Sequence, residues 1–234
     1  VVLEFVKAAM GTPVEIEFAV DLTPAGNGKP NFYILQIKPL LGDLEEYNLD
    51  LSQVGREQLV LYSDRAMGNG RIDGLRDVIF VDPERFDRAR TVEMTRELEE
   101  LNNRLKRDNR HYILIGPGRW GSRDPWLGIP VNWNHISNVK VIVEAELPDF
   151  KIDPSLGSHF FHNVTSMNIG YFDIPCSTGG NFIDWQWLRS QPPANRTDHF
   201  LHLQFKDPLV AKMDGRKRIS VIFKPPEDGQ RGVS

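Results

Sequence analysis

The chain begins with two different hydrophobic periodicities, and each predicts a different element. Apolar residues recur first at helical spacing over Val1–Ala9 and then at every second position over Val14–Asp21. A polar, glycine-containing loop separates this run from a second apolar run, Asn31–Lys38. These patterns predict a helix followed by an antiparallel β-hairpin.

The middle of the chain predicts strands that are connected through a long helix. Short buried strands are expected at Leu59–Ser63 and Val78–Val81, joined by a connection rich in turn residues. The next residue, Asp82, is a typical N-cap, and an apolar stripe then extends from Phe86 to Leu105. This order of elements is typical of an α/β layer.

Five further strands complete the predicted sheet. A buried strand is expected at Tyr112–Ile115, and further strands are expected at Val139–Glu144 and Ile169–Ile174. The last two, His199–Lys206 and Ile219–Phe223, alternate apolar and polar residues and predict a terminal antiparallel hairpin. The fold class is therefore α/β (mixed α+β), with a ligand site expected beyond the strand ends.

The same patterns predict a division into domains. Residues 1–40 form the end of one domain, residues 41–56 a linker, residues 57–224 an α/β domain and residues 225–234 a disordered tail. The chain begins on Val1 rather than Met and in mid-pattern, from which we expect a piece of a longer polypeptide.

Composition narrows the class of protein. Apolar residues make up 40% and charged residues 26% of the 234 residues, which is ordinary for a globular protein. The net charge of −4 and the scattered basic residues predict neither a nucleic-acid partner nor a membrane partner. A single cysteine, Cys176, excludes an intrachain disulfide, and no apolar run has the length of a membrane span. We therefore expect a cytoplasmic protein.

One glycine-rich stretch, His111–Ser122, stands out as a candidate site. Its predicted strand ends in a loop that contains Gly116, Gly118 and Arg119, and Arg123 follows directly. Glycines allow backbone N–H groups to converge, and guanidinium groups favour an anion such as phosphate or carboxylate. The alternative is a tight structural turn whose arginines are solvated.

The amino-terminal hairpin carries a resemblance to a known family. The segments V-E-I-E-F-A-V-D and F-Y-I-L-Q-I-K-P-L resemble the last hairpin of the ATP-grasp domain in phosphoenolpyruvate synthase and pyruvate phosphate dikinase. The resemblance implies ATP and Mg²⁺ as cofactors, with Glu17 near the metal or phosphates, Gln36 as a polar ligand and Lys38 as the phosphate cation. Lys38 stands where the family usually has arginine, so that phosphate binding would be weaker or altered.

This resemblance covers about the first forty residues. The interpretation without a ligand is a half-buried hairpin with a polar outer face.

His159 is the candidate catalytic residue. The run G-S-H at Gly157–His159 resembles the phosphohistidine motif of the same family, in which a histidine carries phosphate between ATP and substrate. Phe160 and Phe161 depart from the small residues that are usual there. A metal-ligand pair with His162 and a packed, hydrogen-bonded histidine are the alternatives.

The resemblance implies a fragment of an ATP-dependent phosphotransferase of the phosphoenolpyruvate synthase or pyruvate phosphate dikinase type, inactive in isolation. In the full-length protein, the partners would be a nucleotide and a small phosphate acceptor similar to pyruvate. The alternative is a non-catalytic, anion-sensing or regulatory module attached to a degenerate ATP-grasp domain. The sequence predicts no oligomeric state.

Overall fold

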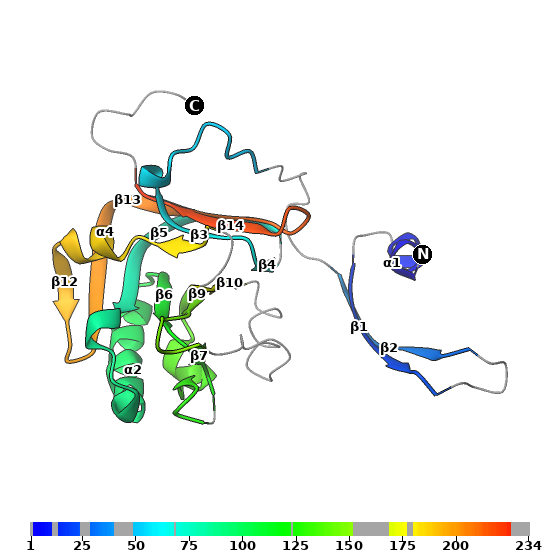
Figure 1. Ribbon diagram of the computed structural model, residues 1–234, viewed down its shortest axis with the longest axis horizontal. Coiled ribbons are helices and arrows are strands. Elements are labelled where there is room, and N and C mark those ends of the chain that lie inside the picture. The colour runs from blue at the N-terminus through cyan, green and yellow to red at the C-terminus, as the bar shows by residue number, and fades with distance from the viewer. Residues whose placement is uncertain are drawn as a thin grey trace. The chain divides into compact units, whose positions relative to one another are not determined.

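The computed structural model divides the chain into two compact units, Val1–Leu44 and Glu45–Ser234 (Figure 1). The division falls inside the predicted linker, and each unit is a separate body. The chain is a mixed α/β protein whose core is mostly sheet. The structure describes residues 2–10, 14–23, 29–39, 49–67, 69–122, 124–151, 169–176 and 180–225.

The first unit consists of one helix and one hairpin, as the periodicity predicts. Helix α1 spans Val2–Met10, and the antiparallel strands β1 and β2 span Val14–Asp21 and Asn31–Pro39. Among the described side chains of this unit, Val6 alone is buried. A two-stranded hairpin is marginally stable without further packing, so this unit has little to hold it together.

The second unit contains most of the secondary structure. Its helices are the 3₁₀ turns η1 (Arg56–Gln58), η2 (Pro83–Arg85), η3 (Arg88–Arg90) and η4 (Trp133–Ile136) and the α-helices α2 (Thr91–Arg107) and α4 (Trp185–Ser190). Its strands are β3 (Leu59–Ser63), β4 (Ala66–Met67), β5 (Gly70–Val81), β6 (Tyr112–Pro117), β7 (Arg119–Trp120), β8 (Gly128–Ile129), β9 (Val139–Ala145), β10 (Gly170–Ile174), β11 (Phe182–Ile183), β12 (Pro193–Arg196), β13 (Phe200–Asp214) and β14 (Ile219–Phe223).

The large sheet is strongly curved, so that strands from the two ends of its order approach each other. Its order is β11-β3-β14-β13-β5-β6-β9-β10-β4, with β12 paired to β13. Strands β5, β6, β9 and β10 are parallel neighbours, whereas β3, β14, β13 and β5 pair antiparallel. Strand β3 is the second strand of this order and β10 is the second to last. Ser63 Oγ at the end of β3 donates a hydrogen bond to the Asp173 carbonyl of β10 at 2.6 Å, which links the two sides of the curved sheet.

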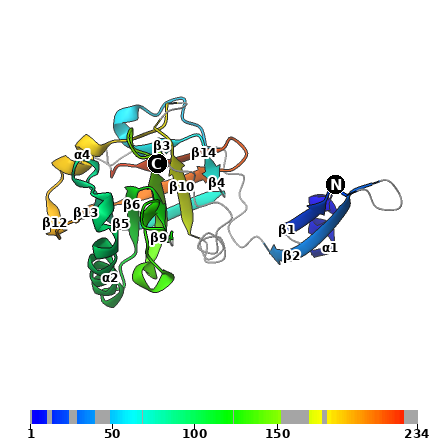
Figure 2. The ribbon, with the colours of Figure 1, turned by 60° about the horizontal axis from the view of Figure 1, so that its bottom comes forward.

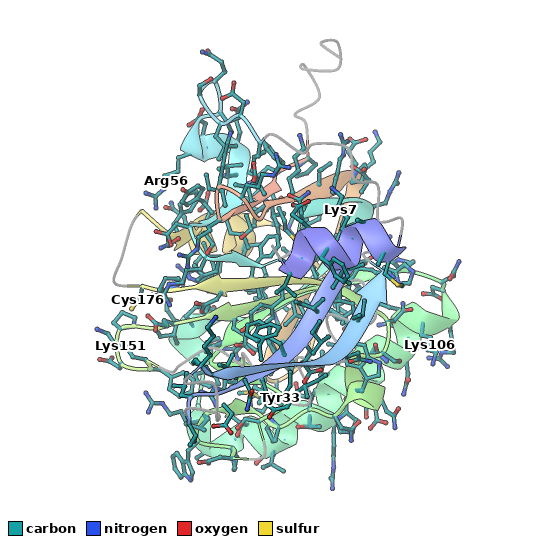
Figure 3. The ribbon with its side chains drawn as sticks, turned by 90° about the vertical axis from the view of Figure 1, so that its right-hand side faces the viewer. Lys7, Tyr33, Arg56, Lys106, Lys151 and Cys176 are labelled. Carbon is teal, nitrogen blue, oxygen red and sulfur yellow. The ribbon has the colours of Figure 1, made fainter. Side chains whose placement is uncertain are left out.

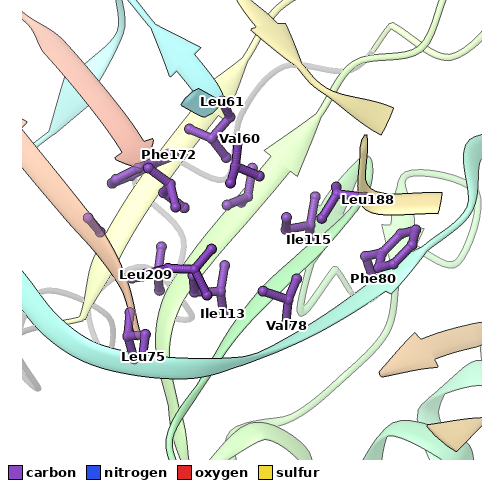
Figure 4. Close-up of a cluster of buried hydrophobic side chains, with 14 of the residues drawn as sticks. Val60, Leu61, Leu75, Val78, Phe80, Ile113, Ile115, Phe172, Leu188 and Leu209 are labelled. Atoms are coloured by element: carbon purple, nitrogen blue, oxygen red, sulfur yellow. The ribbon is translucent and has the colours of Figure 1, made fainter. Parts of the chain in front are cut away.

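The curved sheet has an apolar core on each face. The inner core gathers side chains from β3, β5, β6, β9, β10, β13 and β14, including Val78, Ile113 and Phe172, and Leu188 of α4 joins it (Figure 4). The outer core lies between the sheet and α2, whose buried side chains include Met94 and Leu98 (Figure 2). Because the central parallel strands are buried on both faces, most of their residues are apolar.

Two elements differ from the sequence prediction. Strand β5 begins at Gly70, inside the segment predicted as a turn-rich connection, where Gly70 and Gly74 adopt positive φ angles of 146° and 76°. Pairing with β13 makes this segment a strand, because a sheet neighbour outweighs local propensity. The predicted helix from Asp82 is also shorter: Asp82 caps the 3₁₀ turn η2, and α2 begins only at Thr91.

The carboxyl-terminal part of the predicted linker packs on the second unit. Leu49 is buried beside Leu59 and Val221, and its N–H donates to Asp214 Oδ2 at 3.1 Å. The predicted terminal hairpin is confirmed as β13 and β14, although β13 continues to Asp214.

Candidate functional site

The hairpin brings together residues that the family resemblance singles out. In the β1–β2 register Glu17 lies opposite Gln36, and Glu15 lies opposite Lys38. Directly opposed residues share one face of a sheet, and so do residues two apart along a strand. Glu17 and Gln36 are both exposed, and the side chain of Lys38 lies outside the described residues. The backbone therefore presents the predicted carboxylate, amide and lysine positions on one face.

A β-bulge adjoins these positions. The register shifts between Glu17 and Phe18, so that Leu35 has no partner across the strand pair. The opposite face is apolar, with the rings of Phe18 and Phe32 stacked at a centroid separation of 4.8 Å. Bulges commonly redirect side chains next to binding sites. The hairpin thus has one polar and one apolar face.

In the second unit, the carboxyl ends of β5, β6, β9 and β10 form the edge where ligands usually bind in parallel sheets. Two buried carboxylates lie there in register, Glu144 on β9 and Asp173 on β10. Glu144 accepts hydrogen bonds from the Trp120 N–H at 2.9 Å and from the Tyr171 hydroxyl. This carboxylate fastens the glycine-rich loop to the sheet.

Asp173 has a different electrostatic environment. Arg65 Nη1 lies 3.1 Å from its Oδ2, but that arginine side chain is 41% exposed whereas the aspartate is 8% exposed. Burial raises the pKa of Asp173, the hydrogen bond and charge of Arg65 oppose this rise, and the charges of Glu146 and Asp64 add to it. The pKa of Asp173 is therefore raised overall, so this carboxyl group keeps its proton to a higher pH than an ordinary aspartate does.

Cys176 follows β10 at the same edge (Figure 3). Its side chain is exposed, and its N–H donates to Glu146 Oε2 at 3.1 Å. The thiol therefore lies on the surface, whereas the backbone N–H of Cys176 is held by Glu146.

The glycine-rich loop does not form the predicted amide cradle. The N–H groups of Gly118 and Arg119 donate to the carbonyls of Ala145 and Leu127, at 3.0 and 2.9 Å. The Trp120 N–H donates to Glu144, and the Gly121 N–H donates to the Ile129 carbonyl at 3.0 Å. An anion site built from these four amides is therefore wrong, because each already has an acceptor within the protein. An anion role for the side chains of Arg119 and Arg123 stays a prediction.

The glycines of this loop serve close packing instead. Gly118 has a φ of 70°, and a Cβ at this position would lie 2.5 Å from the ring of Phe150. A Cβ on Gly116 would meet the ring of the buried Trp120, whose indole N–H donates to the Val143 carbonyl at 3.0 Å. Both predicted cofactor-binding glycines are thus buried against aromatic rings.

Phe150 also lines a pocket that the sequence did not indicate. The pocket has a volume of about 340 Å³ and lies at the carboxyl ends of β5 and β9. Phe86 contributes because it adopts an extended conformation between the 3₁₀ turns, rather than the helical one that the apolar stripe predicts. The pocket is lined by Pro83, Glu84, Phe86, Arg88, Leu147, Pro148, Asp149 and Phe150.

The sequence also gave no indication of a buried charge network near the opposite ends of the parallel strands. Asp77, which is 1% exposed, accepts a hydrogen bond from Arg110 Nε at 3.0 Å and lies 2.7 Å from His202 Nε2. These residues come from β5, the turn after α2 and β13. The three residues are far apart in the sequence, so no spacing pattern predicts that they meet.

Several predicted residues lie outside the described part of the chain. His159, His162 and Arg123 are among them. Within the described ranges, no three or more His, Cys, Asp or Glu side chains are grouped to hold a metal ion. The described helices include none long and apolar enough to cross a membrane.

Comparisons with protein-family models, curated proteins and solved structures found no match to the chain.

Proposed function

We propose that this chain acts, within a longer polypeptide, as part of an ATP-dependent phosphotransferase of the phosphoenolpyruvate synthase or pyruvate phosphate dikinase type. The observation that supports the proposal is the hairpin register, which sets Glu17 opposite Gln36 and Glu15 opposite Lys38. ATP would be the phosphate donor, His159 the residue that carries the phosphate, and a small molecule similar to pyruvate the acceptor.

The hairpin residues suit part of a magnesium–phosphate site. Glu17 and Gln36 offer two exposed oxygen ligands on one face, and magnesium in proteins takes oxygen ligands while retaining several waters. When bound, the metal would neutralise charge on the phosphates. Glu17 would hold the metal, and Gln36 and Lys38 would orient the phosphate groups.

ATP binding by this chain alone measures how much of the nucleotide site the hairpin supplies. One metal ligand, one amide and one cation leave the nucleotide base and most of the phosphate charge without partners. Calorimetry with magnesium-ATP should therefore detect no tight binding, and the chain should not hydrolyse ATP. A dissociation constant near 1 μM, or about −8 kcal/mol, would contradict the view that this site is partial.

The full-length polypeptide tests the activity itself. Glu17→Gln should reduce ATP-dependent phosphorylation of the protein by about tenfold or more, because it removes the charge that holds the metal. Glu57→Gln is the matched control, since Glu57 is an exposed glutamate in the second unit. Equal activity in both variants would remove the hairpin from the mechanism.

Labelled ATP tests the histidine. Acid-labile label that disappears in His159→Ala and persists in His162→Ala would support His159 as the phosphate carrier. Equal labelling of the two variants, or no label in the wild type, would exclude it.

A second candidate function is a non-catalytic ligand-binding or regulatory module. The pocket beside Phe150 favours it, because ligands of α/β domains commonly bind beyond the carboxyl ends of parallel strands. A full-length protein that binds a small molecule in its second unit but transfers no phosphate would support this module over the phosphotransferase.

A further inference from the structure

The pocket beside Phe150 has the chemistry of a binding site for a small anion with an apolar body. Most of its wall is apolar: Pro83, Phe86, Leu147, Pro148 and Phe150. Phe86 and Phe150 pack with ring centroids 5.4 Å apart, so two aromatic side chains form one continuous surface. A volume of about 340 Å³ suits a metabolite-sized molecule rather than a macromolecule.

Arg88 supplies the positive charge of this pocket, and its guanidinium group is held in place. Its Cζ lies 4.2 Å from the centre of the Phe150 ring, and its Nη2 donates to the Asp149 carbonyl. In the described part of the chain, the other guanidinium N–H groups make no further hydrogen bond. A restrained guanidinium with unused donors is suited to a carboxylate or a phosphate ester.

The acidic residues of the wall do not reverse this preference. Glu84 shares the guanidinium of Arg189 with Asp82, which lies 3.5 Å from it, and the Glu84 side chain is 73% exposed, so pairing and water together weaken its charge at the pocket. Asp149 is exposed, where water screens its charge. A cationic ligand would also compete with Arg88 for the face of Phe150.

We propose that this pocket binds a small organic acid with a flat apolar body, whose anionic group pairs with Arg88 and whose body packs between Phe86 and Leu147. The proposal does not depend on the phosphotransferase, because none of the lining residues belongs to the hairpin unit.

The experiment uses the whole chain and three fluorinated probes of one size, 4-fluorobenzoate, 4-fluorobenzyl alcohol and 4-fluorobenzamidine, followed by ¹⁹F NMR. The benzoate should bind saturably with a dissociation constant near 1 mM, as expected for so small a ligand. The alcohol should bind at least fivefold more weakly because it lacks the charge, and the amidine should bind most weakly.

Two substitutions locate the binding. Arg88→Gln should weaken benzoate binding about tenfold and leave alcohol binding nearly unchanged, because only the charged contact is lost. Arg85→Gln is the matched control, since Arg85 is an exposed neighbour that does not line the pocket. Phe86→Ala should weaken binding of the benzoate and the alcohol alike.

Three results would overturn the proposal. They are no benzoate binding at about 10 mM, equal benzoate binding in the Arg88→Gln and Arg85→Gln variants, or tighter binding of the amidine than of the benzoate. None of them bears on phosphate transfer by the hairpin, so the two proposals fail separately.

Discussion

The two units of this chain differ most in how far their apolar side chains are buried and in whether their carboxylates have partners within the protein. In the hairpin unit, Phe5, Phe18 and Leu35 are more than half exposed, and Val6 is the single buried residue among the described side chains. In the second unit, an apolar core lies on each face of the curved sheet, and the buried carboxylates Asp77 and Asp173 have partners.

This difference separates two ways in which a sequence motif acquires a role. The hairpin residues Glu17 and Gln36 are on the surface, so they remain available to a ligand but gain little stability from their surroundings. The glycine-rich loop is held at every amide from Gly118 to Gly121, so its residues build structure rather than a cradle. An exposed polar group stays available to bind a ligand, whereas a group that is already hydrogen-bonded within the protein does not.

Hydrogen exchange should give the largest contrast between the units. Strands β6 and β9 are central strands of the large sheet and are buried on both faces, whereas β1 and β2 form a sheet of only two strands. We expect protection at least about 10³-fold higher in β6 and β9. Equal protection measured by NMR on the whole chain would show that the hairpin has a packing partner.

Within the second unit, removal of Asp77 should have the largest effect of a single substitution. Asp77→Ala leaves the guanidinium of Arg110 without its counter-charge and the buried Nε2 of His202 without its hydrogen-bond partner, which should cost about 3–5 kcal/mol of unfolding free energy. The matched control is Asp73→Ala, which breaks an exposed pair with Arg71 and should cost less than about 1 kcal/mol. Urea unfolding measures both, and similar losses would contradict the importance of burial.

Alanine at Gly118 tests the packing role of the glycine-rich loop. It should cost about 1–2 kcal/mol for the left-handed backbone and about 1–3 kcal/mol more for displacing the Phe150 ring. Gly180→Ala separates the two terms, because Gly180 has a φ of 80° and open space around its Cβ position. Thermal unfolding should show the larger loss for Gly118→Ala, whose Cβ would also lie 2.7 Å from the Leu127 carbonyl oxygen. Equal losses would mean that Phe150 and Leu127 both move aside without cost.

The smallest expected effect is the pH dependence that Asp173 confers. Burial raises the pKa of Asp173, so its stability contribution is fully present below the ordinary aspartate pKa and is lost as pH rises through the raised value. Asparagine stays neutral, so Asp173→Asn should gain stability relative to the wild type between about pH 3 and pH 7.

Asp214 supplies the opposite control. Hydrogen bonds from the Lys217, Leu49 and Arg216 N–H groups lower its pKa, and the first of these is the largest cause. Asp214→Asn should therefore lose stability relative to the wild type as pH rises from about 3 to 7. Unfolding titrations that gave both variants the same sign would show that Arg65 outweighs burial at Asp173.

Secondary-structure elements that depend on the order of neighbouring residues can be predicted from the sequence. The period-two alternation and the intervening loop were enough to predict β1 and β2, with Glu17 and Gln36 on opposing strands, because pairing across a short loop needs no distant partner. The apolar run Tyr112–Ile115 likewise predicts the buried strand β6, and the predicted strands Val139–Glu144 and Ile169–Ile174 correspond to β9 and β10.

Contacts between residues that are far apart in the sequence became apparent only in the tertiary structure. The glycine-rich loop predicted an anion cradle, but its amides found acceptors on Leu127, Glu144 and Ala145, which no local pattern specifies. The pocket joins η2 to the residues after β9, and Asp77 meets His202 across 125 positions. Such contacts depend on the order of the strands and the curvature of the sheet. These bring together side chains that are far apart in the sequence, and no sequence periodicity predicts that they meet.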